Sequence, residues 1–155
     1  MQRKQKQGFT LIEILIVVAI IAILASVVLI GLGPTQQAGR DARRLSDLRE
    51  TQNALELYYN AKGTYPAVAT WSALSAAIVA ANIGITQPLP NDPTNSGVYV
   101  YEYSVNGTDS AYVIATTLEN KSNAVFTGYN APDLTGFSGS VASCPAGGPT
   151  YCLTL

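Results

Sequence analysis

The sequence predicts an α+β protein in which a long N-terminal α-helix, membrane-spanning in its lower half, packs by its upper half on a small antiparallel β-sheet. Three observations support this fold class. Residues 11–30 are apolar except for Glu13 and Ser26. Two later segments, rich in Val and Tyr, have the composition and alternation of β-strands. Between the apolar run and these two segments, apolar side chains recur with helical spacing at Leu45, Leu48, Leu55 and Tyr59.

The first apolar run has the length that a membrane-spanning helix requires, which is about 20 residues. Arg3, Lys4 and Lys6 precede it without any acidic residue. Such a basic flank stays in the cytoplasm. The chain after residue 30 is therefore expected on the other side of the membrane.

The helix is expected to be interrupted at residues 31–34, whose sequence is GLGP, because glycine and proline weaken or kink a helix. The apolar stripe indicates that the helix then resumes. Gly63 suits a left-handed C-terminal cap, and Pro66 prevents a further turn. We therefore divide this part of the chain into a transmembrane segment, residues 9–32, and an amphipathic continuation, residues 33–62.

The remaining residues, 63–155, are expected to form a globular head. Its expected elements are a short helix over residues 71–81, a loop over 87–97, a hairpin of strands over 98–104 and 111–119, and a short strand over 124–127. From residue 130 onward the chain is rich in Gly, Pro and Ser, and we expect little regular structure there. A sheet of three or four antiparallel strands laid on the upper helix follows from this order.

Glu13 is the one charge inside the apolar run, and a cap explains part of its presence. Thr10 and Glu13 have the spacing of a capping box, and Phe9 and Ile14 stand where a hydrophobic staple places its two residues. On these grounds alone the segment is a plain membrane anchor. A cleaved secretory signal fits less well, because the apolar run is too long and AILAS, residues 22–26, is a poor cleavage site.

The hexapeptide GFTLIE, residues 8–13, follows a short basic segment and opens an apolar helix. In this it resembles the class III signal peptide of type IV pilins and of the pseudopilins of type II secretion. The resemblance implies a leader peptide, residues 1–8, that prepilin peptidase removes by cutting between Gly8 and Phe9. It also implies N-methylation of Phe9 and a role in assembly for Glu13, whose carboxylate would pair with the N-terminal ammonium of a neighbouring subunit.

A pilin-like fold and a structural, non-enzymatic role follow from the same resemblance. The chain would be a major or minor pilin of a type IV pilus-like filament, a helical homo-oligomer whose core is formed by residues 9–32. Its partners would be the membrane, prepilin peptidase and the inner-membrane assembly platform. The protein would be a single-pass cytoplasmic membrane protein before assembly and part of an extracellular or periplasmic filament afterwards.

Two alternatives remain open. A type II secretion pseudopilin is favoured by the helix ending NAKGTYP, residues 60–66, and by LPNDP, residues 89–93, whereas a C-terminal disulfide favours the pilus subunit. A monomeric membrane-anchored binding domain, in which Glu13 is only a cap, is the more distant alternative. The helix breakers at residues 31–34 are compatible either with a rigid kink or with a segment that melts when subunits pack.

Cys144 and Cys152 are the two cysteines of the chain, and both lie in its exported part. An even number of cysteines in an oxidising compartment favours a disulfide over a metal site. The pair would close the short loop PAGGPTY, residues 145–151. We expect this bond to stabilise the C-terminal region.

The composition excludes several kinds of chemistry. The chain contains no histidine, the commonest general base and a frequent metal ligand, and shows no nucleophilic triad or phosphate-binding loop. We therefore predict no enzyme. Basic and acidic residues alternate on the upper helix, which indicates a solvated face rather than a nucleic-acid site. These residues are Arg40, Arg43, Arg44 and Arg49 with Asp41, Asp47 and Glu50.

Acidic and amide side chains in the expected loops are candidate ligands for a structural calcium ion, which takes six to eight oxygens. They are Asn91, Asp92, Asp109 and Asp133. Major pseudopilins, which are similar in the segment LPNDP, use a loop calcium to hold the sheet. Because the ligand pattern does not match residue by residue, we expect turn-forming side chains and no cofactor.

Overall fold

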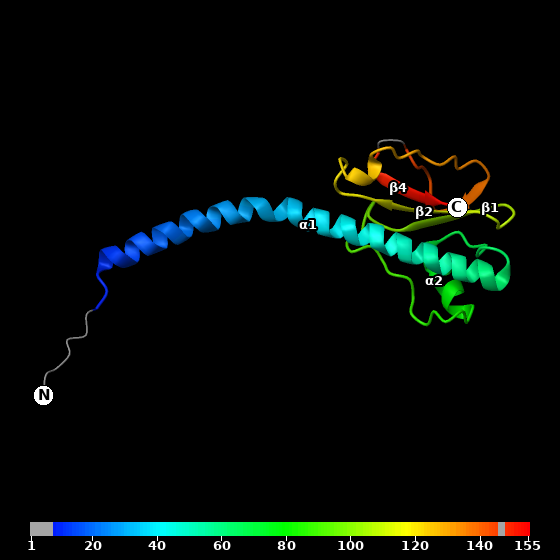
Figure 1. Ribbon diagram of the computed structural model, residues 1–155, viewed down its shortest axis with the longest axis horizontal. Coiled ribbons are helices and arrows are strands. Elements are labelled where there is room, and N and C mark those ends of the chain that lie inside the picture. The colour runs from blue at the N-terminus through cyan, green and yellow to red at the C-terminus, as the bar shows by residue number, and fades with distance from the viewer. Residues whose placement is uncertain (1–7, 146–147) are drawn as a thin grey trace, which may run out of the picture. The chain divides into compact units, whose positions relative to one another are not determined.

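The computed structural model describes residues 8–145 and 148–155, without the side chains of residues 27–32. Apart from Gly8, the expected leader peptide lies outside the described residues. The chain divides into two compact units, Met1–Gln36 and Gln37–Leu155. The 52-residue helix α1, Leu11–Lys62, contributes to both units (Figure 1).

Helix α1 is continuous, so the predicted interruption at residues 31–34 is wrong. Pro34 lies inside the helix. A proline removes one intrahelical donor and costs about 3 kcal/mol. The residues on both sides include strong helix formers, among them Leu32, Gln36 and Ala38, and the helical geometry therefore continues past the proline.

Within the described part of the chain, no helix is long and apolar enough to cross a membrane. The membrane-spanning segment expected over residues 9–32 includes residues 27–32, whose side chains are not described.

The C-terminus of α1 and the short helix that follows agree with the predictions. Gly63 has a φ of 78°, and its amide donates to the carbonyl of Tyr59 at 2.8 Å, as a left-handed helix cap requires. Helix α2, Trp71–Ala80, begins where Thr70 Oγ1 accepts from the amide of Ala73. Thr70 is therefore an N-cap.

The sheet has four antiparallel strands in the order β3-β1-β2-β4. The strands are β1, Glu102–Asn106, β2, Tyr112–Thr117, β3, Phe137–Gly139, and β4, Thr150–Thr154. The predicted hairpin is present, but β1 begins four residues later than expected. The cause is a tight turn in which Ser96 and Tyr99 exchange backbone hydrogen bonds.

Two expectations for the C-terminal region are wrong. The segment expected to be a short strand is a 3₁₀ helix, η1, Ala124–Phe126, whose N-cap Asn123 accepts from the amide of Val125. The tail supplies both edge strands of the sheet, although we expected little regular structure there. Strand β4 is placed by its pairing with β2, in which Cys152 faces Ala115.

Both faces of the sheet are covered. Alternate side chains of a strand point to opposite faces, so Tyr112 and Ile114 enter one core cluster while Val113 and Ala115 enter another. The first cluster combines Leu48, Ala54 and Leu55 of α1 with Trp71, Leu74 and Ile78 of α2. The second consists of strand residues and the C-terminal tail around the two cysteines. The head is thus a helix–sheet–tail sandwich (Figure 1).

Candidate functional site

The first turn of α1 contains the capping box that the sequence predicts. The backbone amide of Thr10 donates to Glu13 Oε2 at 2.8 Å, and the Thr10 hydroxyl donates to the same oxygen at 2.7 Å. In return, the amide of Glu13 donates to Thr10 Oγ1 at 3.4 Å. Among the described residues, both hydrogen bonds to this carboxylate use Oε2. The second oxygen, Oε1, therefore remains available to a cation.

The helix that follows Glu13 carries apolar side chains on every side. Phe9 is 86% exposed and Leu11 82%, and the other large apolar residues as far as Leu24 are at least half exposed. A helix that is apolar all round is normally buried in a protein interior, in a membrane or against other helices. Residues 9–24 therefore form an apolar surface that the unit containing them leaves uncovered.

The predicted cleavage and methylation residues lie directly before this surface. Gly8 and Phe9 precede the first residue of α1 and are exposed. A Cβ added at Gly8 would meet nothing within 4 Å, so the Gly8–Phe9 bond is sterically accessible. Along a helix, four residues span about 6 Å. An N-terminal ammonium at Phe9 would thus lie about one helical turn from Glu13.

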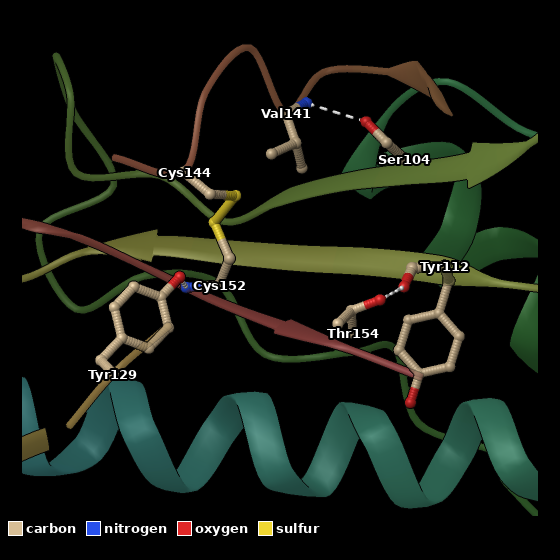
Figure 2. Close-up of a disulfide and its surroundings, with 7 residues drawn as sticks. All are labelled: Ser104, Tyr112, Tyr129, Val141, Cys144, Cys152 and Thr154. Atoms are coloured by element: carbon tan, nitrogen blue, oxygen red, sulfur yellow. Dashed lines mark hydrogen bonds between the residues drawn. A yellow bond between two sulfur atoms is a disulfide. The ribbon is translucent and has the colours of Figure 1, made fainter. Parts of the chain in front are cut away.

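The C-terminal tail is fixed by the disulfide Cys144–Cys152, whose Cα atoms are 5.9 Å apart. Both cysteines are buried, and the amide of Cys152 donates to the hydroxyl of Tyr129 at 3.1 Å (Figure 2). Val141 of the same tail donates its amide to Ser104 Oγ of β1 at 3.1 Å. These bonds hold the segment from Val141 to Cys144 against both β1 and β4.

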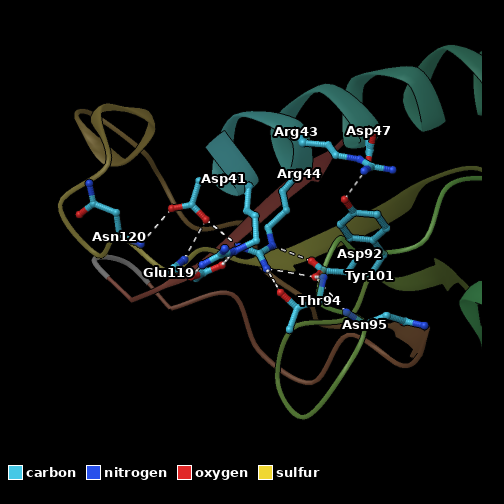
Figure 3. A network of polar contacts seen from close by, with 11 residues as sticks. Asp41, Arg43, Arg44, Asp47, Asp92, Thr94, Asn95, Tyr101, Glu119 and Asn120 are labelled. Carbon is cyan, nitrogen blue, oxygen red and sulfur yellow. Dashed lines mark hydrogen bonds and ion pairs between the residues drawn. The ribbon is translucent and has the colours of Figure 1, made fainter. Parts of the chain in front are cut away.

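A buried arginine joins three separate segments of the head (Figure 3). Arg44 of α1 binds Asp92 through two bonds, from Nε to Oδ2 at 2.6 Å and from Nη2 to Oδ1 at 3.0 Å. Its Nη1 donates to Asp41 Oδ1 and to Glu119 Oε1, both at 2.8 Å. Nη2 also donates to Thr94 Oγ1 at 3.0 Å. A guanidinium has five N–H donors, and all five are used.

The electrostatics of this network favour the charged forms. Burial opposes the charge of Arg44, but hydrogen bonds to Asp92, Glu119 and Asp41 outweigh it and raise the pKa of the guanidinium. The hydrogen bond from Arg40 is the main reason that the pKa of Glu119 falls to about 2. Burial of Asp92 is likewise outweighed by Arg44, so the pKa of this carboxyl is lowered.

The prediction of a solvated charged face on the upper helix is wrong for the inner residues. Asp41 and Arg44 are fully buried and Asp47 is 8% exposed, whereas Arg43 and Arg49 remain on the surface. Sequence reasoning missed this network because its partners lie 48 and 75 residues from Arg44. A signal was nevertheless present, because Arg44 lies four residues before Leu48 and thus on the same helix face.

The candidate calcium ligands do not come together, and the residues present do not fit the ion. Asp92 is bound by Arg44 and closes a turn by accepting from the amide of Thr94 at 2.8 Å. Asp133 makes the same kind of turn with the amide of Thr135 at 2.9 Å. In the parts of the chain that the structure describes, no three acidic, His or Cys side chains are arranged to hold a metal.

Comparison with known proteins gives a match to a sequence motif and partial matches to several relatives. A model of the prokaryotic N-terminal methylation motif matches residues 3–29. The chain is 36% identical to the type II secretion system core protein G of Klebsiella pneumoniae over 101 residues, which are 60% of the chain and 72% of that protein. It is 31% identical over 103 residues to the protein of that name from Klebsiella michiganensis, of which it covers 71%.

Another relative is matched over a shorter segment. The type II secretion system core protein G of Aeromonas hydrophila is 35% identical over 66 residues, which are 43% of the chain. The chain spans only 46% of the length of that protein. No solved structure gives a significant match.

Proposed function

Because this chain belongs to the type IV pilin and pseudopilin family, we propose that it is a structural subunit of a type II secretion pseudopilus. The sequence placed a pilus subunit first and a pseudopilin second. The relatives favour the second reading, because those that match over most of their length are named type II secretion system core protein G. The role is mechanical rather than catalytic.

The uncovered apolar helix carries this proposal. Residues 9–24 expose large apolar side chains in every direction, and an apolar surface of this extent is typical of a protein or membrane contact. In the proposed subunit, residues 1–8 are a leader, residues 9–32 anchor the precursor in the membrane and then enter the filament core, and residues 33–62 connect them to the head, residues 63–155. Prepilin peptidase and an inner-membrane assembly platform are the proposed partners.

In this proposal, the carboxylate of Glu13 favours the assembled filament over the isolated subunit. A lone carboxylate costs on the order of 2.5–3.5 kcal/mol at the middle of a bilayer and less near its interface. The cap with Thr10 satisfies only one of the two oxygens of Glu13. Cleavage after Gly8 creates an ammonium at Phe9. When subunits pack side by side, the ammonium of one pairs with Glu13 of the next, and the cost of the charge is offset only in the filament.

Replacing Glu13 by glutamine tests this role sharply. A glutamine still accepts the capping bond from the amide of Thr10, so α1 keeps its first turn while the charge is lost. We expect Glu13→Gln protein to reach the membrane but to be missing from the filament fraction. Glu50→Gln, at an exposed position of α1, is the matched control and should assemble normally.

The alternative of a monomeric membrane-anchored domain predicts a different result for these two variants. If Glu13 serves only as a cap, Glu13→Gln and Glu50→Gln proteins behave alike. Deleting the gene distinguishes a secretion pseudopilin from a pilus subunit. Loss of a pseudopilin abolishes protein secretion, whereas loss of a pilin abolishes surface pili.

A further inference from the structure

Three carboxylates meet in the interior of the head and require a positive charge. Asp41 is fully buried, Asp92 is 4% exposed, and the side chain of Glu119 is 10% exposed. They come from α1, from the loop before β1 and from the segment after β2. Burial of each such charge is strongly unfavourable unless the charge is paired and hydrogen-bonded. A cation at their centre is therefore a condition of this arrangement.

The centre is occupied by the guanidinium of Arg44. Its five donors are directed to the three carboxylates and to Thr94 Oγ1, at 2.6–3.0 Å. The ring of Tyr99 covers one face of the guanidinium, with its centroid 4.8 Å from Cζ. All five N–H donors of the guanidinium are thus hydrogen-bonded to protein groups, and one of its faces is covered by an aromatic ring.

The same oxygens are the ones that a divalent cation would need. Calcium takes six to eight oxygen ligands, and Asp92 was one of the four candidate ligands named from the sequence. Both oxygens of Asp92 instead accept from Arg44, and Oδ1 also accepts from the amides of Thr94 and Asn95. Asp41 uses its oxygens for Arg44 and for the amides of Glu119 and Asn120.

We infer that the Arg44 guanidinium is the built-in structural cation of the head, so that the loop from Asp92 to Tyr99 is ordered without a metal ion. The loop is tied to α1 through Asp92 and Thr94, and its tight turn at Ser96 and Tyr99 follows directly. A subunit of this design keeps its head folded whether or not calcium is present outside the cell.

The wild-type full-length chain in detergent provides the first test, with calcium chloride and EDTA as the probes. Thermal unfolding should have the same midpoint in millimolar calcium and in excess EDTA. A structural calcium site saturated a thousandfold would raise the midpoint by roughly 10 °C or more. A rise of that size, or calcium binding detected by titration calorimetry, would overturn the inference.

Two arginine variants provide the second test. Arg44→Ala should lower the midpoint by on the order of 10 °C or more, because buried carboxylates lose their partner. Arg43→Ala makes the same change of charge one residue away, on the surface and 3.7 Å from Asp47, and should lower it by less than about 4 °C. Equal midpoints for the two variants would contradict the inference.

Arg44→Lys covers the case in which Arg44→Ala does not fold. Lysine keeps the charge but has three donors on one atom instead of a planar fork of five. Its midpoint should lie below that of the wild type, and a midpoint equal to the wild type would show that the guanidinium is not required. Because every readout is the unfolding of the head, a failure of Glu13-dependent assembly would not affect these results.

Discussion

The hydroxyl of Tyr101 donates a 2.7 Å hydrogen bond to Asp47 Oδ2 inside the head (Figure 3). Tyr101 is 5% exposed and Asp47 is 8% exposed, so water does not readily replace this bond. Burial, together with the bond to Asp47, raises the pKa of Tyr101 above its usual range. The phenol therefore remains protonated, and a hydrogen-bond donor, at neutral pH.

Removal of this hydroxyl should destabilise the protein. A hydrogen bond to a charged group contributes about 1.5–3 kcal/mol, and we expect Tyr101→Phe to lower the free energy of unfolding in urea by about that amount. Tyr59→Phe is the control, because Tyr59 is 38% exposed and its ring stacks on Tyr65 with or without the hydroxyl. The prediction fails if both variants unfold at the same urea concentration.

The Arg44 network predicts a loss of stability in acid. The pKa of Glu119 is about 2 in the folded protein, against a usual value of 4.5, and the pKa of Asp92 is also lowered. Since the unfolded chain takes up these protons at a higher pH, the stability they provide is present above about pH 5 and is lost as the pH falls towards 2. Urea unfolding measured over this range should show the decline.

A Glu119→Gln variant provides the comparison for the acid experiment. It removes one titrating carboxylate, so its stability should be lower at neutral pH and should depend less on pH between 5 and 2. Glu50→Gln changes an exposed carboxylate of α1 and should retain the wild-type profile. If the stability of Glu119→Gln protein falls with pH in parallel with the wild type, protonation of Glu119 does not govern the loss of stability in acid.

Reduction of the disulfide should weaken the C-terminal sheet. Cys144 and Cys152 are eight positions apart, and closure of so short a loop stabilises a protein by about 2–3 kcal/mol in the chain-entropy model. Dithiothreitol should lower the free energy of unfolding by that amount. In a Cys144→Ala/Cys152→Ala protein the reagent should have no effect, whereas an unchanged wild type would refute a stabilising role.

Alanine substitutions at Gly39, inside α1, and at Gly63, at its C-terminal cap, should change the free energy of unfolding in opposite directions. Gly63 has a φ of 78°, a conformation in which an alanine costs about 1–2 kcal/mol. Gly39 lies inside the helix with no atom within 4 Å of an added Cβ, so alanine there should stabilise by roughly 0.5–1 kcal/mol. Thermal unfolding of the two variants distinguishes these effects, and shifts in the same direction would contradict the assignment.

Features with local signals in the sequence were predicted well. The capping box at Thr10 and Glu13, the helix end at Gly63, the short helix after Thr70 and the β1–β2 hairpin each depend on residues within a few positions of one another. The two edge strands have no such signal. In β3, Gly139 has a φ of 156°, and a Cβ there would clash with the carbonyl oxygen of Tyr103. Only a glycine permits the pairing of β3 with β1 at this position. In the sequence alone, however, a glycine indicates a loop.

The buried charges were missed for a related reason. Along α1, Asp41, Arg44, Leu48, Thr51 and Leu55 follow one another at intervals of three and four residues and are all fully buried. Charged residues on such a face are expected to reach solvent unless partners arrive from elsewhere. Here the partners, Asp92 and Glu119, arrive only through the tertiary fold.

We propose that the chain is processed between Gly8 and Phe9 and assembled through helix α1, which follows Phe9. The most direct measurement is the intact mass of the protein recovered from the filament fraction of its host. We expect a chain that begins at Phe9 and carries one N-terminal methyl group. A chain that still begins at Met1, in a host that has prepilin peptidase, would contradict it and would leave Glu13 as the cap of a membrane anchor.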